Sequence, residues 1–241
     1  MSGPPLLARQ ALAEFLGSAG LVTVVIGSGI AAQRLSPDDV GLQLLQNALA
    51  TGAGLVALIL AFGPVSGGHF NPVVTLADRF LGGVTNEQVA AYLPAQLAGG
   101  AVGAIAANVM FELPAVTVST TERSAGGLWL SEALATFGLV VLIFALVRAG
   151  RAALAPFAVG AYITAAYWWS SSTSFANPMI DLARTLSDTF TGIAPSSVPV
   201  FVVMQLVGGA SALVVVTLLY PVATAADEVV VPHESAAEGS S

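Results

Sequence analysis

Two stretches of the sequence place Asn followed by Pro inside long apolar runs: SGGHFNPVVTLAD at residues 66–78 and SSSTSFANPMIDLAR at residues 170–184. Asn is a favourable N-cap of a helix, and Pro is favoured at the first helical position, where no backbone N–H is needed. Each pair therefore predicts a helix start. We expect short helices over about residues 72–81 and 178–190.

The composition places the chain in a membrane. Of its 241 residues, 56% are hydrophobic and 9% are charged, whereas soluble domains carry about 25% charged residues. The chain has no Cys, only two His and no basic patch, which argues against a metal site and against nucleic acid as a partner. A Ser-rich run at residues 170–174 has no base beside it, so we expect no catalytic residues, no enzyme activity and no cofactor.

Six segments are long enough to cross a hydrocarbon core of about 30 Å as helices. They cover residues 10–31, 41–63, 87–110, 128–149, 153–174 and 198–220. Thr85 or Asn86 is the expected N-cap of the third segment. Beyond these segments, we expect the acidic, Ser-rich residues 227–241 to be disordered.

The two halves of the chain repeat each other. QLAGGA at residues 96–101 returns as QLVGGA at 205–210, and both Asn-Pro pairs sit in runs too long for one span, as re-entrant segments do. Three spans in each half make the duplication an inverted repeat. We expect an all-α membrane protein of six transmembrane helices and two re-entrant half-helices, with repeats at residues 1–115 and 116–226.

In an inverted repeat the N-termini of the two half-helices meet near the membrane midplane. Each carries about half a positive charge, and Asn71 and Asn177 add hydrogen-bond donors. Such a place suits a neutral, hydrogen-bonding solute and repels cations. The sequence therefore favours a passive channel for small uncharged solutes.

These features resemble the aquaporin (major intrinsic protein) family over about residues 8–221. The resemblance rests on both Asn-Pro pairs, SGGHFNP, AEFLG at residues 13–17 and the repeated QLxGGA. It implies a homotetramer in the lipid bilayer, with one pore in each subunit. It also implies that Glu14 and Glu132 accept hydrogen bonds from the backbone of the Asn-Pro loops.

The sequence departs from the family pattern at the pore. The usual Asn-Pro-Ala is Asn-Pro-Val and Asn-Pro-Met here, so the expected midplane residues are Asn71, Pro72, Val73, Asn177, Pro178 and Met179. Ile180 stands where the family's filter has Arg. Counting from the Asn residues, the other filter positions are Thr51, Ala165 and Ser174.

Such a filter is wide, uncharged and half apolar, so we expect it to pass solutes larger than water. It resembles that of a bacterial, aquaglyceroporin-like subgroup associated with arsenic resistance, and Asp181 matches an Asp of glycerol-conducting members. The resemblance implies metalloid hydroxides (arsenite), glycerol-like polyols and some water as solutes. A strict water channel is the alternative.

Several other residues are candidates for the pore. His69, Phe175, Gly67 and Gly68 are candidates to line it. Arg184 lies one turn beyond Ile180 and could supply a charge at the pore mouth together with Asp181; the alternative is that Arg184 pairs with Asp181 or Asp188.

Two other function classes stay open. An ion-coupled secondary transporter would use Glu14 and Glu132 as its coupling site, and an intramembrane enzyme would need His69 as its base. An excess of Arg at residues 9, 79, 148 and 151 over Arg34 and Arg123 predicts cytoplasmic termini in the cell inner (plasma) membrane.

Overall fold

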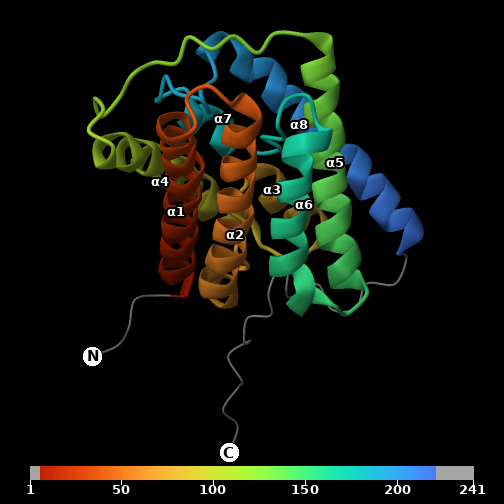
Figure 1. Ribbon diagram of the computed structural model, residues 1–241. Coiled ribbons are helices and arrows are strands. Elements are labelled where there is room, and N and C mark those ends of the chain that lie inside the picture. The colour runs from red at the N-terminus through yellow and green to blue at the C-terminus, as the bar shows by residue number, and fades with distance from the viewer. Residues whose placement is uncertain (1–5, 221–241) are drawn as a thin grey trace, which may run out of the picture.

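The computed structural model describes residues 6–220, and within them all regular structure is helical (Figure 1). The acidic segment 227–241 lies outside the described residues. Eight α-helices follow in order: α1 Leu6–Leu35, α2 Val40–Ser66, α3 Pro72–Leu81, α4 Asn86–Met110, α5 Gly126–Arg148, α6 Ala155–Trp169, α7 Pro178–Arg184 and α8 Val198–Leu219. Single 3₁₀ turns at Ala152–Leu154 and Pro195–Ser197 precede α6 and α8.

Five of these helices are long and apolar enough to cross a membrane by length and composition: α1, α2, α4, α5 and α8 with its preceding turn. The sixth expected span, residues 153–174, is represented by α6, which is only 15 residues long. The helix ends at Trp169 because Ser170 adopts an extended backbone (φ −100°, ψ 132°). The segment after Trp169 already belongs to the re-entrant loop.

The helices pack as an inverted repeat. α1 packs against α4 and α2, α5 packs against α8 and α6, and α2 joins the halves by packing against α6. Figure 1 shows α1, α2, α6 and α5 running alongside one another, with the half-helices α3 and α7 behind them. Each half therefore contributes three long elements and one half-helix that turns back inside the bundle.

The first glycine of each repeated Gly-Gly pair brings two helices close together. A Cβ built on Gly99 of α4 would collide with the backbone carbonyl oxygen of Phe15 in α1. A Cβ on Gly208 of α8 would collide in the same way with the carbonyl of Ala133 in α5. The repeated glycines are therefore a packing requirement of both halves.

Local capping chemistry fixes the starts of the shorter elements. Thr85 caps α4 in a capping box with Gln88, which resolves the choice between Thr85 and Asn86. Asn71 caps α3 with Pro72 at the first helical position, and Asn177 caps α7 with Pro178. Both half-helices thus begin where the Asn-Pro pairs predict.

The second half-helix is shorter than the expected 178–190, because α7 ends at Arg184. The backbone carbonyls that follow Arg184 accept hydrogen bonds from the loop between α4 and α5. The N–H of Ser119 donates to the Thr185 carbonyl at 2.9 Å, and the N–H of Thr117 donates to the Leu186 carbonyl at 3.0 Å. The carbonyls that follow the last residue of α7 therefore pair with a distant loop instead of with a further turn of the helix.

Candidate functional site

The tips of the two half-helices are tied together by their capping residues. The Asn71 side-chain oxygen accepts from the N–H of Val73 at 2.9 Å, and the Asn177 oxygen accepts from the N–H of Met179 at 3.0 Å. Each side-chain amide then donates at 2.8 Å to a carbonyl of the opposite loop: Asn71 to Ala176 and Asn177 to Phe70.

The two accepting carbonyls belong to residues in the left-handed region. Phe70 has φ 46° and Ala176 has φ 48°, conformations that a residue with a side chain rarely adopts. This backbone turns each carbonyl toward the opposite Asn. Such strained residues persist only when the surroundings fix them.

Two buried glutamates fix the loops. Glu14 in α1 accepts from the N–H groups of His69 and Phe70 at 2.9 and 2.8 Å. Glu132 in α5 accepts from the N–H groups of Phe175 and Ala176 at 2.9 and 2.8 Å. Both carboxylates are fully buried, and these bonds satisfy them, since a buried carboxylate needs donors.

A glutamine of the repeated QLxGGA motif completes each support. Gln96 donates to Glu14 at 2.8 Å and to the Thr75 hydroxyl at 2.9 Å. Gln205 donates to Glu132 at 2.7 Å and to the Asp181 carboxylate at 3.1 Å. Asp181 therefore takes the place of Thr75 in the second repeat, facing Gln205, and it does not line the cavity at the tips.

A cavity runs past the half-helix tips between the two halves of the chain. One part of its wall is aliphatic: Leu21, Val25, Leu55, Ile59, Val74, Leu139, Ile143, Val159, Ile163 and Ile180. The rest is polar, aromatic or glycine: Thr51, Gly68, His69, Phe70, Asn71, Tyr167, Ser174, Phe175, Asn177 and Arg184. A solute in this cavity meets hydroxyl, amide and guanidinium groups together with a long apolar wall.

Three of the four expected filter residues line the cavity, namely Thr51, Ser174 and Ile180. Ala165 does not: it is exposed on the outer face of α6. Tyr167 lines the cavity instead, with its hydroxyl 3.2 Å from the Thr51 hydroxyl. The ring of Tyr167 makes this part of the cavity more polar and more crowded than the sequence suggested.

The third residue of each Asn-Pro motif packs behind the tip, outside the cavity. Val73 lies against Gly209 of α8, and Met179 lies against Gly100 of α4. A Cβ on either glycine would come within 2.5 Å of the facing side chain. Pro72 and Pro178 are buried in the first turns, and Gly67 ends α2 with φ 90°. Gly68, by contrast, lines the cavity.

His69 lines the cavity and is held on two sides. Its Nδ1 lies 3.0 Å from the Thr75 hydroxyl, and its Nε2 lies 3.6 Å from the Asp78 carboxylate. Its ring packs edge-on against Tyr92 with 5.5 Å between centroids. These contacts hold the imidazole at the first half-helix.

Arg184 makes neither of the ion pairs that its sequence neighbours suggested. Asp181 faces Gln205, and Asp188 accepts from the N–H of Thr120 at 3.0 Å. Within residues 6–220 no ion pair joins Arg184 to either acid. Its guanidinium lies instead on the Phe175 ring, with Cζ 3.4 Å from the ring centroid, and it lines the cavity.

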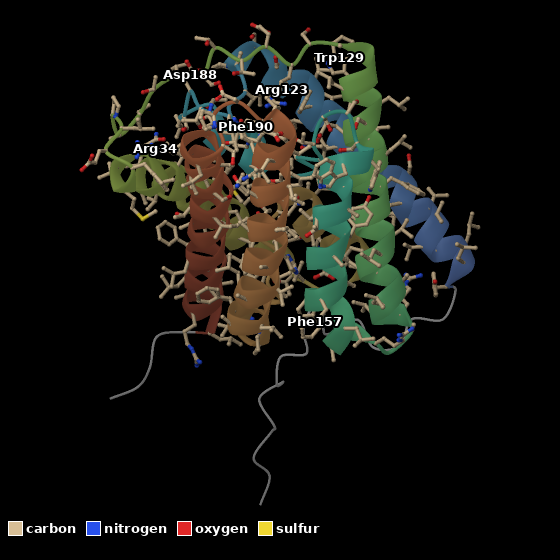
Figure 2. All side chains as sticks on the ribbon, in the orientation of Figure 1. Arg34, Arg123, Trp129, Phe157, Asp188 and Phe190 are labelled. Atoms are coloured by element: carbon tan, nitrogen blue, oxygen red, sulfur yellow. The ribbon has the colours of Figure 1, made fainter. Side chains whose placement is uncertain are left out.

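A second arginine approaches the same ring from the loop after α4. Arg123 places its Cζ 5.1 Å from the Phe175 centroid, and its Nε donates to the Gly192 carbonyl at 2.9 Å. Burial lowers the pKa of the Arg123 guanidinium, and Glu132 and Tyr167 oppose that shift. Figure 2 shows Arg123 and Asp188 at the same end of the molecule, opposite Phe157. Arg123 therefore lies toward this end of the molecule, on the Phe175 ring that Arg184 also contacts.

Comparisons with known proteins agree with this geometry. A family model described as "Major intrinsic protein" matches residues 4–174. The chain is 48% identical over 207 residues to "Aquaglyceroporin AqpS" of Rhizobium meliloti (strain 1021), covering 86% of this chain and 88% of that protein. It is 28% identical over 251 residues to "Probable aquaporin TIP5-1" of Oryza sativa subsp. japonica, with 98% and 93% covered.

A solved structure shares the fold. The aquaglyceroporin from Plasmodium falciparum superposes with a TM-score of 0.68 at 20% sequence identity, covering 89% of this chain and 98% of that one. Members of the matching family are multi-pass membrane channels. The chain belongs to the major intrinsic protein family.

Proposed function

We propose that the chain is a passive channel for small uncharged solutes larger than water. It would pass metalloid hydroxides such as arsenite, glycerol-like polyols, and some water. The observation that carries the proposal is the cavity wall beside the tips, where Thr51 and Ser174 contribute hydroxyls and Ile180 belongs to an aliphatic surface. A solute with hydroxyl groups can form hydrogen bonds with these hydroxyls while it moves along the aliphatic surface.

The relative with 48% identity supports the larger solutes, since its printed name is that of an aquaglyceroporin. The pair Tyr167 and Thr51 supports the alternative of a strict water channel. Their hydroxyls are 3.2 Å apart and narrow the cavity. Flux measurements with solutes of increasing size decide between these two candidates.

The support of the loops favours a channel over an ion-coupled transporter. Glu14 and Glu132 each accept several short hydrogen bonds and are fully buried. A carboxylate that binds and releases a coupling ion needs free coordination sites. We assign both glutamates to the support of the loops.

The assembly and placement of the chain follow from the same proposal. The repeats would divide near residue 115, with the second ending near residue 226, and four copies would form a homotetramer with one pore each. Arg9, Arg79, Arg148 and Arg151 would face the cytoplasm across the inner (plasma) membrane. Both termini would then be cytoplasmic.

Stopped-flow light scattering on proteoliposomes tests the function. Water, glycerol and arsenite are compared for the wild type and for Ile180→Arg. We expect all three to enter wild-type vesicles without an ion gradient, and Ile180→Arg to block glycerol and arsenite while water still passes. Wild-type vesicles that pass water alone would establish the strict water channel, and uptake that needs a proton or sodium gradient would establish a transporter.

A further inference from the structure

The guanidinium of Arg184 lines the cavity, although Arg184 is not one of the four expected filter residues. Arg184 lies four residues after Ile180 on α7. Residues so spaced share a helix face and lie about 6 Å apart along the axis. Both line the cavity, so the guanidinium stands about one turn beyond the position that Ile180 occupies.

The guanidinium is held in place by neighbouring groups. Its Nε donates to the carbonyl of Thr191, and its plane lies on the Phe175 ring with Cζ 3.4 Å from the centroid. Cation–π contacts of this kind are attractive at distances up to about 6 Å. Arg123, bonded through Nε to the next carbonyl, Gly192, approaches the same ring.

This anchoring leaves the terminal nitrogens for a solute. Within residues 6–220, the side-chain hydrogen bond of Arg184 uses Nε only, and no carboxylate pairs with the guanidinium. The guanidinium carries four further N–H donors on its two terminal nitrogens. Because the side chain lines the cavity, these donors can reach an oxygen of a passing molecule.

The charge around the cavity favours neutral solutes. No Asp or Glu is among its lining residues in the described part of the chain. Arg184 and the two half-helix N-termini therefore repel cations. An anion would have to lose its water beside a largely aliphatic wall, which is costly. A neutral solute with oxygen acceptors meets neither obstacle.

The first repeat contains the same arrangement with an acidic residue in place of the arginine. Asp78 stands seven residues after Asn71, as Arg184 stands seven after Asn177. Asp78 contacts His69 as Arg184 contacts Phe175, and His69 and Phe175 both stand two residues before an Asn. The second turn of each half-helix is therefore built to aim a side chain at a cavity-lining loop residue.

We propose that Arg184 is a specificity-determining residue of the channel. It contacts the passing solute through its terminal nitrogens, selects neutral solutes with oxygen acceptors, and excludes cations. Phe175 and Thr191 hold it in position, and Arg123 adds a second positive charge. The inference rests on the proposed function for its neutral solutes, while its exclusion of cations is tested separately.

The test uses the full-length protein in proteoliposomes. Glycerol and water entry are followed by stopped-flow light scattering, and proton and potassium leak by fluorescent dyes. The variants are Arg184→Met, Arg184→Lys, and the double variant Arg184→Met with Ile180→Arg. Arg34→Gln is the matched control, since Arg34 also stacks on a phenylalanine, Phe111 at 5.2 Å, but does not line the cavity.

We expect Arg184→Met to raise the cation leak at least about tenfold, which corresponds to about 1.4 kcal/mol of barrier, because a positive charge in a poorly solvated pore repels cations more strongly than it would in water. Glycerol entry should fall relative to water. The cation leak of Arg184→Lys and of Arg34→Gln should equal that of the wild type. The double variant should also return to the wild-type leak, because Ile180→Arg places a guanidinium one turn away from position 184.

Cation leak and relative glycerol entry that are unchanged in Arg184→Met would overturn the inference. If Arg184→Met fails to assemble, Arg184→Gln replaces it, since Gln keeps amide donors without the charge. The cation leak of Arg184→Gln is then measured in the same way. The leak is measured whether or not glycerol passes. A wild type that passes only water therefore contradicts the proposed solute range, and the role of Arg184 in excluding cations is still decided.

Discussion

The Asn177 side-chain amide donates a hydrogen bond to the Phe70 carbonyl at 2.8 Å and so joins the second half-helix to the loop of the first. The same side chain caps its own helix through the Met179 N–H. One residue thus links both repeats at the half-helix tips. Asn71 makes the reciprocal bond to Ala176.

Replacing the amide at this link should reduce flux. In Asn177→Asp the carboxylate can still cap α7, but it cannot donate to Phe70 and it adds a negative charge beside that carbonyl. We expect neutral-solute permeability to fall on the order of tenfold, which corresponds to 1.4 kcal/mol. Stopped-flow light scattering measures the change, with protein content matched between vesicles.

Asn47→Asp is the control for this substitution. Asn47 is buried and donates to the Val25 carbonyl and the Ser28 hydroxyl, but it does not line the cavity. It should lower stability with little effect on flux per folded protein. Equal flux in wild type and Asn177→Asp would remove the amide from the conduction path.

The carboxylate of Glu132 should be required for a stable fold. Glu132→Ala leaves the N–H groups of Phe175 and Ala176 without their acceptor, and Gln205 loses a partner. Each unsatisfied buried donor costs about 1–3 kcal/mol. We expect a lower thermal unfolding midpoint in detergent and loss of the folded peak in size-exclusion chromatography.

Glu122→Ala provides the comparison, because Glu122 is an exposed acid that accepts from the hydroxyls of Ser196 and Ser197. It should unfold near the wild-type temperature. A Glu132→Ala protein that is as stable and as active as wild type would contradict the supporting role.

The fit between Met179 and Gly100 predicts a compensating pair of substitutions. Gly100→Ala places a Cβ 2.5 Å from the Met179 sulfur, closer than real contacts allow. Overpacking of this kind costs typically about 1–3 kcal/mol. Met179→Ala alone should also destabilise the protein, by about 2–5 kcal/mol, because it truncates a fully buried side chain. The double variant should lose less stability than the sum of the two single variants, because the Cβ then meets no sulfur and fills part of the space that the Met side chain leaves.

Thermal unfolding of the two single variants and the double variant gives the coupling between these positions. Gly150→Ala is a poor control because Gly150 has φ 69°, whereas Gly127→Ala suits the purpose, since nothing lies within 4 Å of its Cβ. Additive effects of Gly100→Ala and Met179→Ala would show that the two residues do not meet.

The parts of the fold that depend on local chemistry could be predicted from the sequence. Asn71-Pro72 and Asn177-Pro178 specify helix starts because capping involves only the next few residues. The end of α7 could not be predicted, since it depends on bonds from Thr117 and Ser119, more than 60 residues away. The hydrogen bond between Asp188 and Thr120 could not be predicted either, because these two residues are equally far apart in the sequence.

The filter positions were harder to predict, because counting back from Asn177 assumes that the loop before Asn177 has a fixed backbone path. Thr173 and Ser174 adopt left-handed φ values of 65° and 52° in this loop, and α6 stops at Trp169. The helix face that reaches the cavity therefore differs from the one that contains Ala165. Val159, Ile163 and Tyr167 are spaced by four residues, and this helical periodicity is the signal that could have identified Tyr167.

Replacing Tyr167 should widen the channel. Tyr167→Ala removes a ring that lines the cavity and breaks its contact with the Thr51 hydroxyl, so glycerol entry should rise more than water entry. The matched control is Ala165→Leu, two residues earlier on the exposed face of α6, where the side chain does not line the cavity. Its glycerol-to-water ratio should equal that of the wild type. If Ala165→Leu lowers glycerol entry while Tyr167→Ala leaves the ratio unchanged, α6 turns its other face to the solute, and Ala165 regains the filter position that the sequence assigned to it.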